Sequence, residues 1–217
     1  MAYQKVPLSG CISASSQPPA QGLVPDKISL RIGVDIDGVV SDSYPVWLQE
    51  LNRHYGKNIT VLEDYEMHLV FDVPWDDMND FFVRNVEQLF TLPKPMKGAK
   101  EGIEKLIQLG HEIIYITARS PEEEEVTLRW FRKHQIPYTN VLFSGLKSKV
   151  DLVKQWKIEL FVEDYLVNAK LIAESGVPVL LLDATYNKGD LAPGITRCKS
   201  WLEIVNSIDF QKDKLKK

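Results

Sequence analysis

Two aspartates stand two residues apart at the point where an apolar run of the sequence ends. Asp35 and Asp37 belong to the string Asp-Ile-Asp-Gly-Val, and Gly38 allows a turn that brings both carboxylates close to one point. Unpaired carboxylates at such a distance repel each other, and a hard cation with oxygen ligands, such as Mg²⁺, relieves the repulsion. The same short pattern also occurs in calcium loops and ordinary turns, so other residues must decide whether the site is catalytic.

Polar residues follow later apolar runs in the same way. Thr117 ends one run and is followed by Ala118 and Arg119. Lys147 and Lys149 follow the next run, and Glu163 and Asp164 end a further one. Asp164 offers another oxygen to the cation. A hydroxyl and an ammonium group near the same point suit the charge of a transferring phosphoryl group. The pattern therefore favours phosphoryl chemistry, either by attack of a metal-activated water or by attack of the carboxylate itself.

Buried parallel strands are the elements that could carry these residues to one place. Short apolar runs alternate with helical patterns, and this alternation predicts an α/β fold with a parallel sheet. In such a sheet, ligands bind beyond the carboxyl ends of the strands, where the polar residues stand. We predict strands over 29–35, 112–117, 141–144, 160–163 and 179–182.

The helix after the second predicted strand has a clear start. Ser120 can cap it, Pro121 fits its first turn, and Glu123 completes a capping box. The acidic run 122–125 is then explained by the favourable position of carboxylates at a helix N-terminus. We therefore do not assign this run to a metal site.

The interval 42–97 is longer than a single crossover helix requires. It contains helical patterns, for instance over 76–89, and ends in a Pro-rich linker, so we interpret it as a small helical cap. It holds nine of the 21 aromatic residues, which could form the core of the cap or a stacking pocket for a nucleobase. The predicted division is a flexible arm over 1–27, a core over 28–41 and 98–208, the cap over 42–97, and a Lys-rich tail over 209–217.

Composition limits the partners that a chain of this kind can have. Its 217 residues suffice for one core with a modest insertion, and 26 basic against 30 acidic residues leave a net charge of −4. This balance gives no electrostatic footprint for nucleic acid, so we expect a small-molecule substrate. Cys11 and Cys198 are too isolated for a disulfide framework, and no apolar stretch is long enough for a membrane span. We expect a cytoplasmic protein without a membrane partner.

The ordered set of motifs resembles the haloacid dehalogenase-like (HAD) superfamily of phosphatases. The strings DIDGVV, YITAR and FVEDYLVNA appear in the order of that superfamily, with a lysine before the last of them. Within it the chain is similar to the deoxyribonucleotidase-like branch, including bacterial nucleotidase-like members, over about residues 29–207. The resemblance implies a Rossmann-like sheet with a helical cap of the C1 type inserted after the first strand. It also implies Mg²⁺, an aspartyl-phosphate intermediate, and a 5'-nucleotidase-like activity on nucleoside monophosphates.

The resemblance also implies roles for the acidic residues. Asp35 would be the nucleophile and a magnesium ligand. Asp37 would be the general acid and base, and it would bind the metal through its backbone carbonyl. Asp164 would be the remaining metal ligand, and Glu163 would support the residues around the metal.

The phosphate would be bound by Thr117, Ala118 and Lys149 according to the same resemblance. Lys149 would hold the phosphate and the nucleophile together. Lys147 competes for this role, and we favour Lys149 because the residues after it fit the family pattern better.

The chain departs from the deoxyribonucleotidase pattern at two positions. Arg119 replaces a small polar residue, and its guanidinium could grip a phosphate or carboxylate of the substrate, or pair with Glu122 or Glu123. Ser43 stands where the family has an aromatic residue that stacks on the base, six positions after the general acid. Tyr44 could substitute for it, so a nucleoside monophosphate remains the leading substrate.

Other functions share parts of this residue set. A phosphotransferase, or a phosphatase for another small phosphorylated metabolite, would use the same residues. A non-catalytic phosphate binder is disfavoured by the intact Asp35 and Asp37. A receiver domain of two-component signalling is disfavoured because the third predicted strand ends in Ser144, without a carboxylate, and because such domains have no cap. A homodimer is compatible with the sequence.

Overall fold

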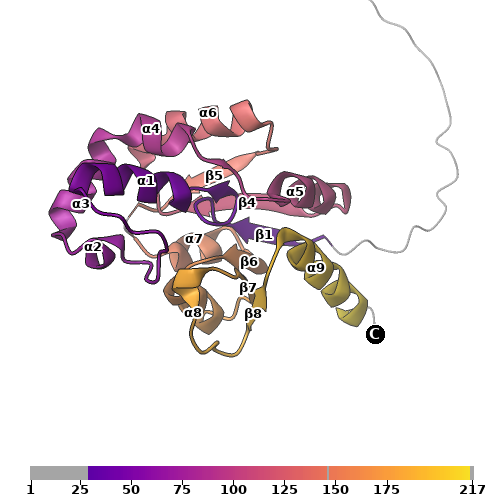
Figure 1. Ribbon diagram of the computed structural model, residues 1–217. Coiled ribbons are helices and arrows are strands. Elements are labelled where there is room, and N and C mark those ends of the chain that lie inside the picture. Colours follow the sequence, from indigo (N-terminus) through magenta and orange to yellow (C-terminus); the bar gives the residue numbers. More distant parts are fainter. Residues whose placement is uncertain (1–28, 146, 216–217) are drawn as a thin grey trace, which may run out of the picture.

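The computed structural model describes the backbone of residues 29–145 and 147–215 (Figure 1). The arm predicted over 1–27, with Cys11, lies outside the described residues. At the other end, helix α9 (Trp201–Leu215) includes most of the Lys-rich segment, so the predicted tail is helical as far as Leu215. Within the described ranges, no helix is both long and apolar enough to cross a bilayer.

A parallel sheet of six strands forms the centre of the fold. Its order is β5-β4-β1-β6-β7-β8, and every neighbouring pair runs parallel. The predicted α/β class with a parallel sheet is therefore confirmed. The strands are β1 (Arg31–Val34), β4 (Glu112–Thr117), β5 (Asn140–Phe143), β6 (Leu160–Glu163), β7 (Val179–Leu182) and β8 (Ile195–Cys198).

Strand β8 adds to the five strands that were predicted. It lies at an edge of the sheet, and only its two end residues are buried, while Thr196 is exposed and Arg197 is half-buried. It therefore lacks the continuous apolar run that marks a strand covered on both faces. In β6 and β7, by contrast, all four residues are buried.

Helices cover both faces of the sheet (Figure 1). On one face, α5, α6 and α9 share a hydrophobic cluster with Tyr115 of β4, and on the other, α7 and α8 pack with Ile114 of the same strand. Each large apolar side chain buried in this way contributes roughly 1.5–3 kcal/mol. In addition to α9, the helices that cover the sheet are α5 (Ala99–Gln108), α6 (Glu124–His134), α7 (Lys149–Gln155) and α8 (Leu166–Glu174).

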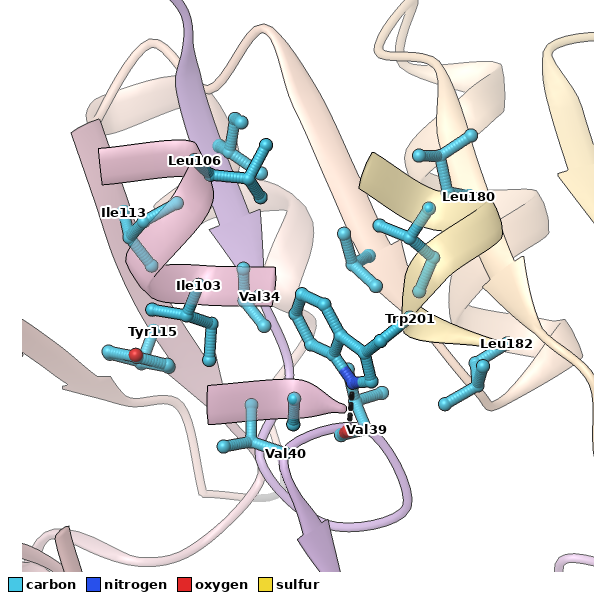
Figure 2. Close-up of a cluster of buried hydrophobic side chains, with 14 of the residues drawn as sticks. Val34, Val39, Val40, Ile103, Leu106, Ile113, Tyr115, Leu180, Leu182 and Trp201 are labelled. Atoms are coloured by element: carbon cyan, nitrogen blue, oxygen red, sulfur yellow. Dashed lines mark hydrogen bonds between the residues drawn. The ribbon is translucent and has the colours of Figure 1, made fainter. Parts of the chain in front are cut away.

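Trp201 connects this core to the loop that follows β1 (Figure 2). Its indole is buried, and its Nε1 donates a hydrogen bond to the backbone carbonyl of Val39 at 2.8 Å. Gly102 of α5 leaves room for the ring, because a Cβ at that position would lie 2.7 Å from it. The core therefore supports the loop that carries Asp35 and Asp37.

The chain between β1 and β4 forms the predicted helical insertion. A short antiparallel pair, β2 (Ser41–Asp42) with β3 (Lys94–Pro95), joins its two ends. Its side chains form a separate hydrophobic cluster that includes Trp47, Phe81 and Phe90 and also reaches Val126 of α6. Its helices are α1 (Tyr44–Tyr55), α2 (Met67–Val70), α3 (Trp75–Arg84) and α4 (Val86–Thr91).

The single helix predicted over 76–89 is wrong in its extent. The chain forms α3 and α4 instead, and the two meet at Asn85. The side-chain Nδ2 of Asn85 donates a hydrogen bond to the backbone carbonyl of Phe81 at 2.7 Å, and such local bonds compete with a continuous helix. Met78 and Leu89 are both buried, so the apolar periodicity identified the buried face although it did not reveal the break.

Candidate active site

Most of the predicted polar residues line one cavity at the carboxyl ends of the strands, and Glu163 and Asp164 are not among the lining residues. Asp35 directly follows β1, Thr117 ends β4, and Glu163 ends β6. Glu163 and Asp164 are completely or almost completely buried. The cavity has a volume of about 580 Å³, and the predicted residues that line it are Asp35, Asp37, Thr117, Ala118, Arg119 and Lys149.

Lys149 lies against the carboxylate that was predicted as the nucleophile. Its Nζ is 2.7 Å from Oδ2 of Asp35 and 3.1 Å from Oε1 of Glu163. The residue begins α7, where Ser148 caps the helix by accepting a hydrogen bond from the backbone N–H of Val150. Lys149 is only 3% exposed, whereas Lys147 is exposed and lines the cavity. The geometry therefore places Lys149, rather than Lys147, beside Asp35.

Burial and mutual contact set the protonation of this group. Burial raises the pKa of Asp35 well above its usual range, and the charge of Glu163 adds to the rise while Lys149 opposes it. Burial is also the main cause that raises the pKa of Asp164. Burial, the largest single influence, raises the pKa of Glu163, but the charge of Lys149 and the hydrogen bonds with neighbouring side chains together outweigh it and lower the pKa. Lys149 alone therefore does not compensate the charge of all these carboxylates.

The carboxylates of Asp35, Glu163 and Asp164 could hold a metal ion. One oxygen from each lies within 4.8 Å of the others. Oδ1 of Asp164 is buried and has no hydrogen-bond partner among the residues that the structure describes. When ionised, three carboxylates against the single ammonium of Lys149 leave a charge of −2. Oxygen ligands, a free buried oxygen and this excess charge all fit Mg²⁺.

Gly38 allows two parts of the site to approach each other closely. Its φ is +77°, in the left-handed region that favours glycine. A Cβ at this position would lie 2.0 Å from Oδ2 of Asp164. A side chain at position 38 would therefore push the loop after β1 away from the loop after β6.

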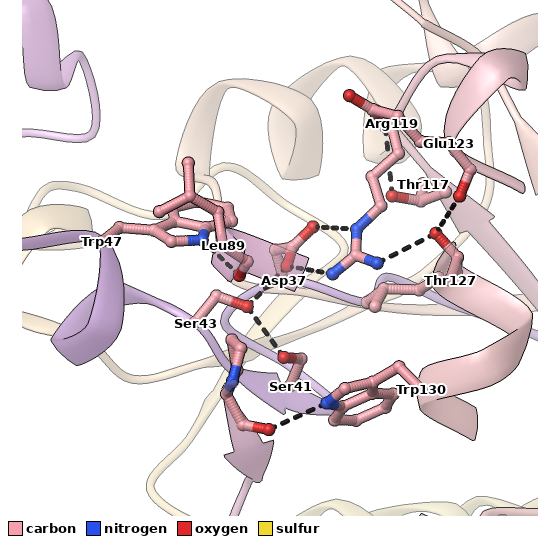
Figure 3. Close-up of polar contacts among 12 residues, drawn as sticks. Asp37, Ser41, Ser43, Trp47, Leu89, Thr117, Arg119, Glu123, Thr127 and Trp130 are labelled. Carbon is pink, nitrogen blue, oxygen red and sulfur yellow. Dashed lines mark hydrogen bonds and ion pairs between the residues drawn. The ribbon is translucent and has the colours of Figure 1, made fainter. Parts of the chain in front are cut away.

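The side chain of Asp37 belongs to a different group of contacts (Figure 3). Its Oδ2 accepts a hydrogen bond from Nε of Arg119 at 2.8 Å, and its Oδ1 accepts one from Nη2 of Arg119 at 2.7 Å. Ser43 also donates its Oγ hydrogen to Oδ1. This partner of Arg119 was not expected from the sequence, and Glu123 instead accepts a hydrogen bond from the backbone N–H of Ser120. A metal contact through the backbone carbonyl of Asp37 stays a prediction.

Thr117 and Ala118 stand at the cavity, between β4 and α6. Thr117 is buried, its Oγ1 accepts a hydrogen bond from the backbone N–H of Arg119 at 3.2 Å, and Ala118 is exposed. Of the predicted capping box, the hydrogen bond from the backbone N–H of Ser120 to Oε2 of Glu123 is present, and the box opens a short 3₁₀ turn before α6. This turn fixes the loop on which Thr117, Ala118 and Arg119 lie.

Two residues that support Asp164 were missed. Oη of Tyr186 donates a hydrogen bond to Oδ2 of Asp164, and Nδ2 of Asn187 donates to the backbone carbonyls of Asp164 at 2.7 Å and Leu182 at 2.8 Å. Both residues lie in the short turn after β7. The polar segment after the fifth predicted strand, from Asp183 onward, is the signal that could have revealed them.

Aromatic and other side chains of the insertion form the remaining walls of the cavity. Tyr44 is one of them, but it is 7% exposed and packs edge-on against Trp47 with ring centroids 5.2 Å apart. Trp75 is more accessible, with 46% of its surface exposed. The side chains from the insertion that line the cavity include Tyr44, Trp47, Tyr65, Met67, His68, Trp75, Met78, Phe82 and Phe90.

Several solved structures that share this architecture carry the name of HAD-superfamily or HAD-like hydrolases. The chain matches a HAD-superfamily hydrolase of subfamily IA from Geobacter sulfurreducens with a TM-score of 0.56 and 21% identity, covering 83% of this chain and 96% of that one. A haloacid dehalogenase-like hydrolase from Streptococcus pneumoniae gives a TM-score of 0.64 at 12% identity, with coverages of 83% and 98%. These similarities show the fold.

Sequence comparison gives the family. The chain is 32% identical over 182 residues to a nucleotidase of Clostridium acetobutylicum, a match that covers 83% of this chain and 94% of the relative. The model of the family described as "5' nucleotidase, deoxy (Pyrimidine), cytosolic type C protein" matches residues 28–214. The predicted resemblance is therefore confirmed, and the chain belongs to this family of HAD-like nucleotidases.

Proposed function

We propose that the protein is a magnesium-dependent phosphomonoester hydrolase that works through an aspartyl phosphate on Asp35. The observation that carries this proposal is the contact between Lys149 and Asp35 at the wall of a cavity that Thr117 also lines. The ammonium group can bridge the carboxylate and an incoming phosphoryl group, and a hydroxyl can contact the same phosphoryl oxygens. Family membership supports a phosphatase and argues against the receiver domain.

The proposed reaction has two balanced halves. A carboxylate oxygen of Asp35 attacks phosphorus, the ester P–O bond breaks, and Asp37 gives its proton to the leaving alcohol. In the second half, Asp37 takes a proton from water, the water oxygen attacks phosphorus, and the bond to Asp35 breaks as phosphate leaves. Mg²⁺ bound by Asp35, Asp164 and the backbone carbonyl of Asp37 would neutralise the charge shared by the carboxylates and the phosphoryl oxygens.

A nucleoside monophosphate is the substrate that we propose. The family model and the Clostridium relative are both named for nucleotidases, and the aromatic walls of the cavity offer apolar surface for a base. Another small phosphorylated metabolite would meet the same Asp35 and Lys149. Transfer of the phosphoryl group to an alcohol instead of water would also use the same residues. A cytoplasmic location and a homodimer stay predictions.

The test is a phosphate-release assay on p-nitrophenyl phosphate and on a panel of nucleotides, sugar phosphates and small phosphorylated acids. We expect turnover with Mg²⁺, strongest on a nucleoside monophosphate, and none in EDTA or with Asp35→Asn. Asp151→Asn is the matched control, because Asp151 is an exposed carboxylate of α7. An added alcohol distinguishes transfer from hydrolysis, since a transferase would form the new ester at the expense of free phosphate. Turnover that survives Asp35→Asn would contradict the covalent mechanism.

A further inference from the structure

Arg119 holds the side chain of Asp37 in a fixed position. The guanidinium makes two hydrogen bonds, from Nε and from Nη2, to the two oxygens of the carboxylate at 2.8 and 2.7 Å. Bidentate pairs of this kind fix the rotation of the carboxylate as well as its distance. The Arg119 side chain is 2% exposed and that of Asp37 is 14% exposed, so water competes little for these bonds.

Arg119 is itself anchored on two sides. Its Nη1 donates to Oγ1 of Thr127 at 2.9 Å, and Thr127 in turn donates to the backbone carbonyl of Glu123 at the start of α6 (Figure 3). The guanidinium carbon also lies 4.1 Å from the ring centroid of Phe90 on α4. The start of α6 and the ring of Phe90 therefore hold the Arg119 guanidinium, which in turn holds Asp37.

We propose that Arg119 is the positioning residue that keeps Asp37 in place for proton transfer, an inference that rests on the proposed function. Proton transfer requires the carboxylate oxygen within about 2.6–3.2 Å of the leaving-group oxygen. An aspartate side chain without partners would distribute over several rotamers. The two bonds from Arg119 select one of them before the substrate arrives.

The contacts also indicate which oxygen of Asp37 exchanges the proton. Each carboxylate oxygen has two lone-pair directions. Oδ1 accepts from Nη2 of Arg119 and from Oγ of Ser43, so both directions are occupied. Oδ2 accepts only from Nε of Arg119 among the described residues, which leaves one direction open. In protonated Asp37 the proton therefore lies on Oδ2 in this open direction. Oδ2 gives it to the leaving oxygen as the P–O bond breaks, and it takes a proton from water in the second half.

A role for Arg119 as a binding site for a second anionic group of the substrate fits the geometry less well. Its Nε, Nη1 and Nη2 all donate to protein oxygens, and the residue is 4% exposed. A substrate anion would have to displace Asp37 to accept hydrogen bonds from Nε and Nη2 of Arg119. The guanidinium therefore binds the carboxylate of Asp37 and not a substrate anion.

The test compares substrates whose leaving groups need a proton to different degrees. An alkyl phosphate, such as a nucleoside 5'-monophosphate, releases an alcohol that requires protonation, whereas p-nitrophenyl phosphate releases a stable anion. For Asp37→Asn and Arg119→Ala, we expect kcat/KM to fall by about 100-fold or more on the alkyl ester and by about 10-fold or less on the aryl ester. Arg119→Lys keeps the charge without the fork and should show the same selective loss, so the test does not depend on the alanine variant folding. Ser43→Ala should show a smaller selective loss.

Arg129→Ala is the matched control. Arg129 of α6 also pairs with a carboxylate, Glu87 of α4, but both side chains are exposed and neither lines the cavity. It should leave both substrates unchanged. If Arg119→Ala and Arg119→Lys lower both substrates equally while Asp37→Asn remains selective, the positioning role is overturned and the proposed function stands. If Asp37→Asn itself is not selective, the acid role of Asp37 in the proposed function fails, and the inference about Arg119 fails with it.

Discussion

Two groups of charged side chains meet at this site, and their charges are balanced differently. Around Lys149, the carboxylates of Asp35, Glu163 and Asp164 face a single ammonium group, and Oδ1 of Asp164 has no hydrogen-bond partner within the described part of the chain. The single carboxylate of Asp37, by contrast, faces the single guanidinium of Arg119, and both of its oxygens accept hydrogen bonds. The first group has the charge and the oxygens to take a cation, and the second is complete without one.

This difference separates two tasks within one cavity. A group of charges that is compensated only when an ion binds should respond to the concentration of that ion. A pair that is compensated by the protein itself should keep its geometry whether or not the ion is present. We therefore expect Mg²⁺ to act on the free energy of unfolding through the carboxylates around Lys149 and not through the pair of Asp37 with Arg119.

The largest effect is expected for Lys149→Met. Among the residues described, it removes the only ammonium that contacts Asp35 and Glu163, and it leaves buried carboxylates unpaired. The free energy of unfolding in EDTA should fall by about 3–5 kcal/mol, as is typical when a buried ion pair loses one partner. Urea unfolding measures this, and Mg²⁺ should restore part of the loss. Lys147→Met is the control and should stay within about 0.5 kcal/mol; equal effects of the two variants would contradict the assignment of Lys149.

Arg119→Ala should destabilise the protein slightly less, because Asp37 keeps Ser43 and some solvent. We expect a loss of about 3 kcal/mol in the free energy of unfolding, and the loss should be the same in Mg²⁺ and in EDTA. The control Arg129→Ala removes an exposed pair and should change stability by less than about 1 kcal/mol. A loss that Mg²⁺ reverses would show that the two groups are not separate.

Removal of Mg²⁺ from the native sequence should have the next largest effect. At a concentration one hundred times its dissociation constant, an ion that binds only the folded state adds about 2.7 kcal/mol to the free energy of unfolding. Asp164→Asn should abolish this increase because it replaces a buried, negatively charged ligand by a neutral amide. In EDTA the variant should be as stable as the native protein or more stable, because one source of repulsion among the carboxylates is gone. An Asp164→Asn protein that still gains stability with Mg²⁺ would place the ion elsewhere.

The strand ends could be predicted from the sequence because buried parallel strands give continuous apolar runs. The polar residues that stop those runs, such as Asp35, Thr117 and Glu163, then fall at one edge of the sheet. Strand β8 was not predicted because only its end residues are buried. The break between α3 and α4 was not predicted because it depends on a local hydrogen bond of the Asn85 side chain. Periodicity reports which face is buried and does not report either of these features.

The partners of the site residues were harder to predict than their positions. Arg119 and Asp37 are 82 residues apart in the chain, and their contact depends on how the loops after β1 and β4 meet in space. The sequence offered nearby carboxylates at positions 122 and 123, and local proximity made them the obvious candidates. Tyr186 and Asn187 were missed for a related reason, since they reach Asp164 from the turn after the neighbouring strand β7.

The central claim is that phosphate is transferred to Asp35, and borohydride trapping during turnover tests it most directly. Borohydride reduces an acyl phosphate on aspartate to homoserine, which peptide mass spectrometry can locate. We expect homoserine at position 35 in the native protein with substrate and Mg²⁺, and none without substrate or in EDTA. The variant Arg119→Ala should still show the label at Asp35 with an aryl phosphate. Steady turnover with no reduction at Asp35, or with the modification at another aspartate, would contradict this account.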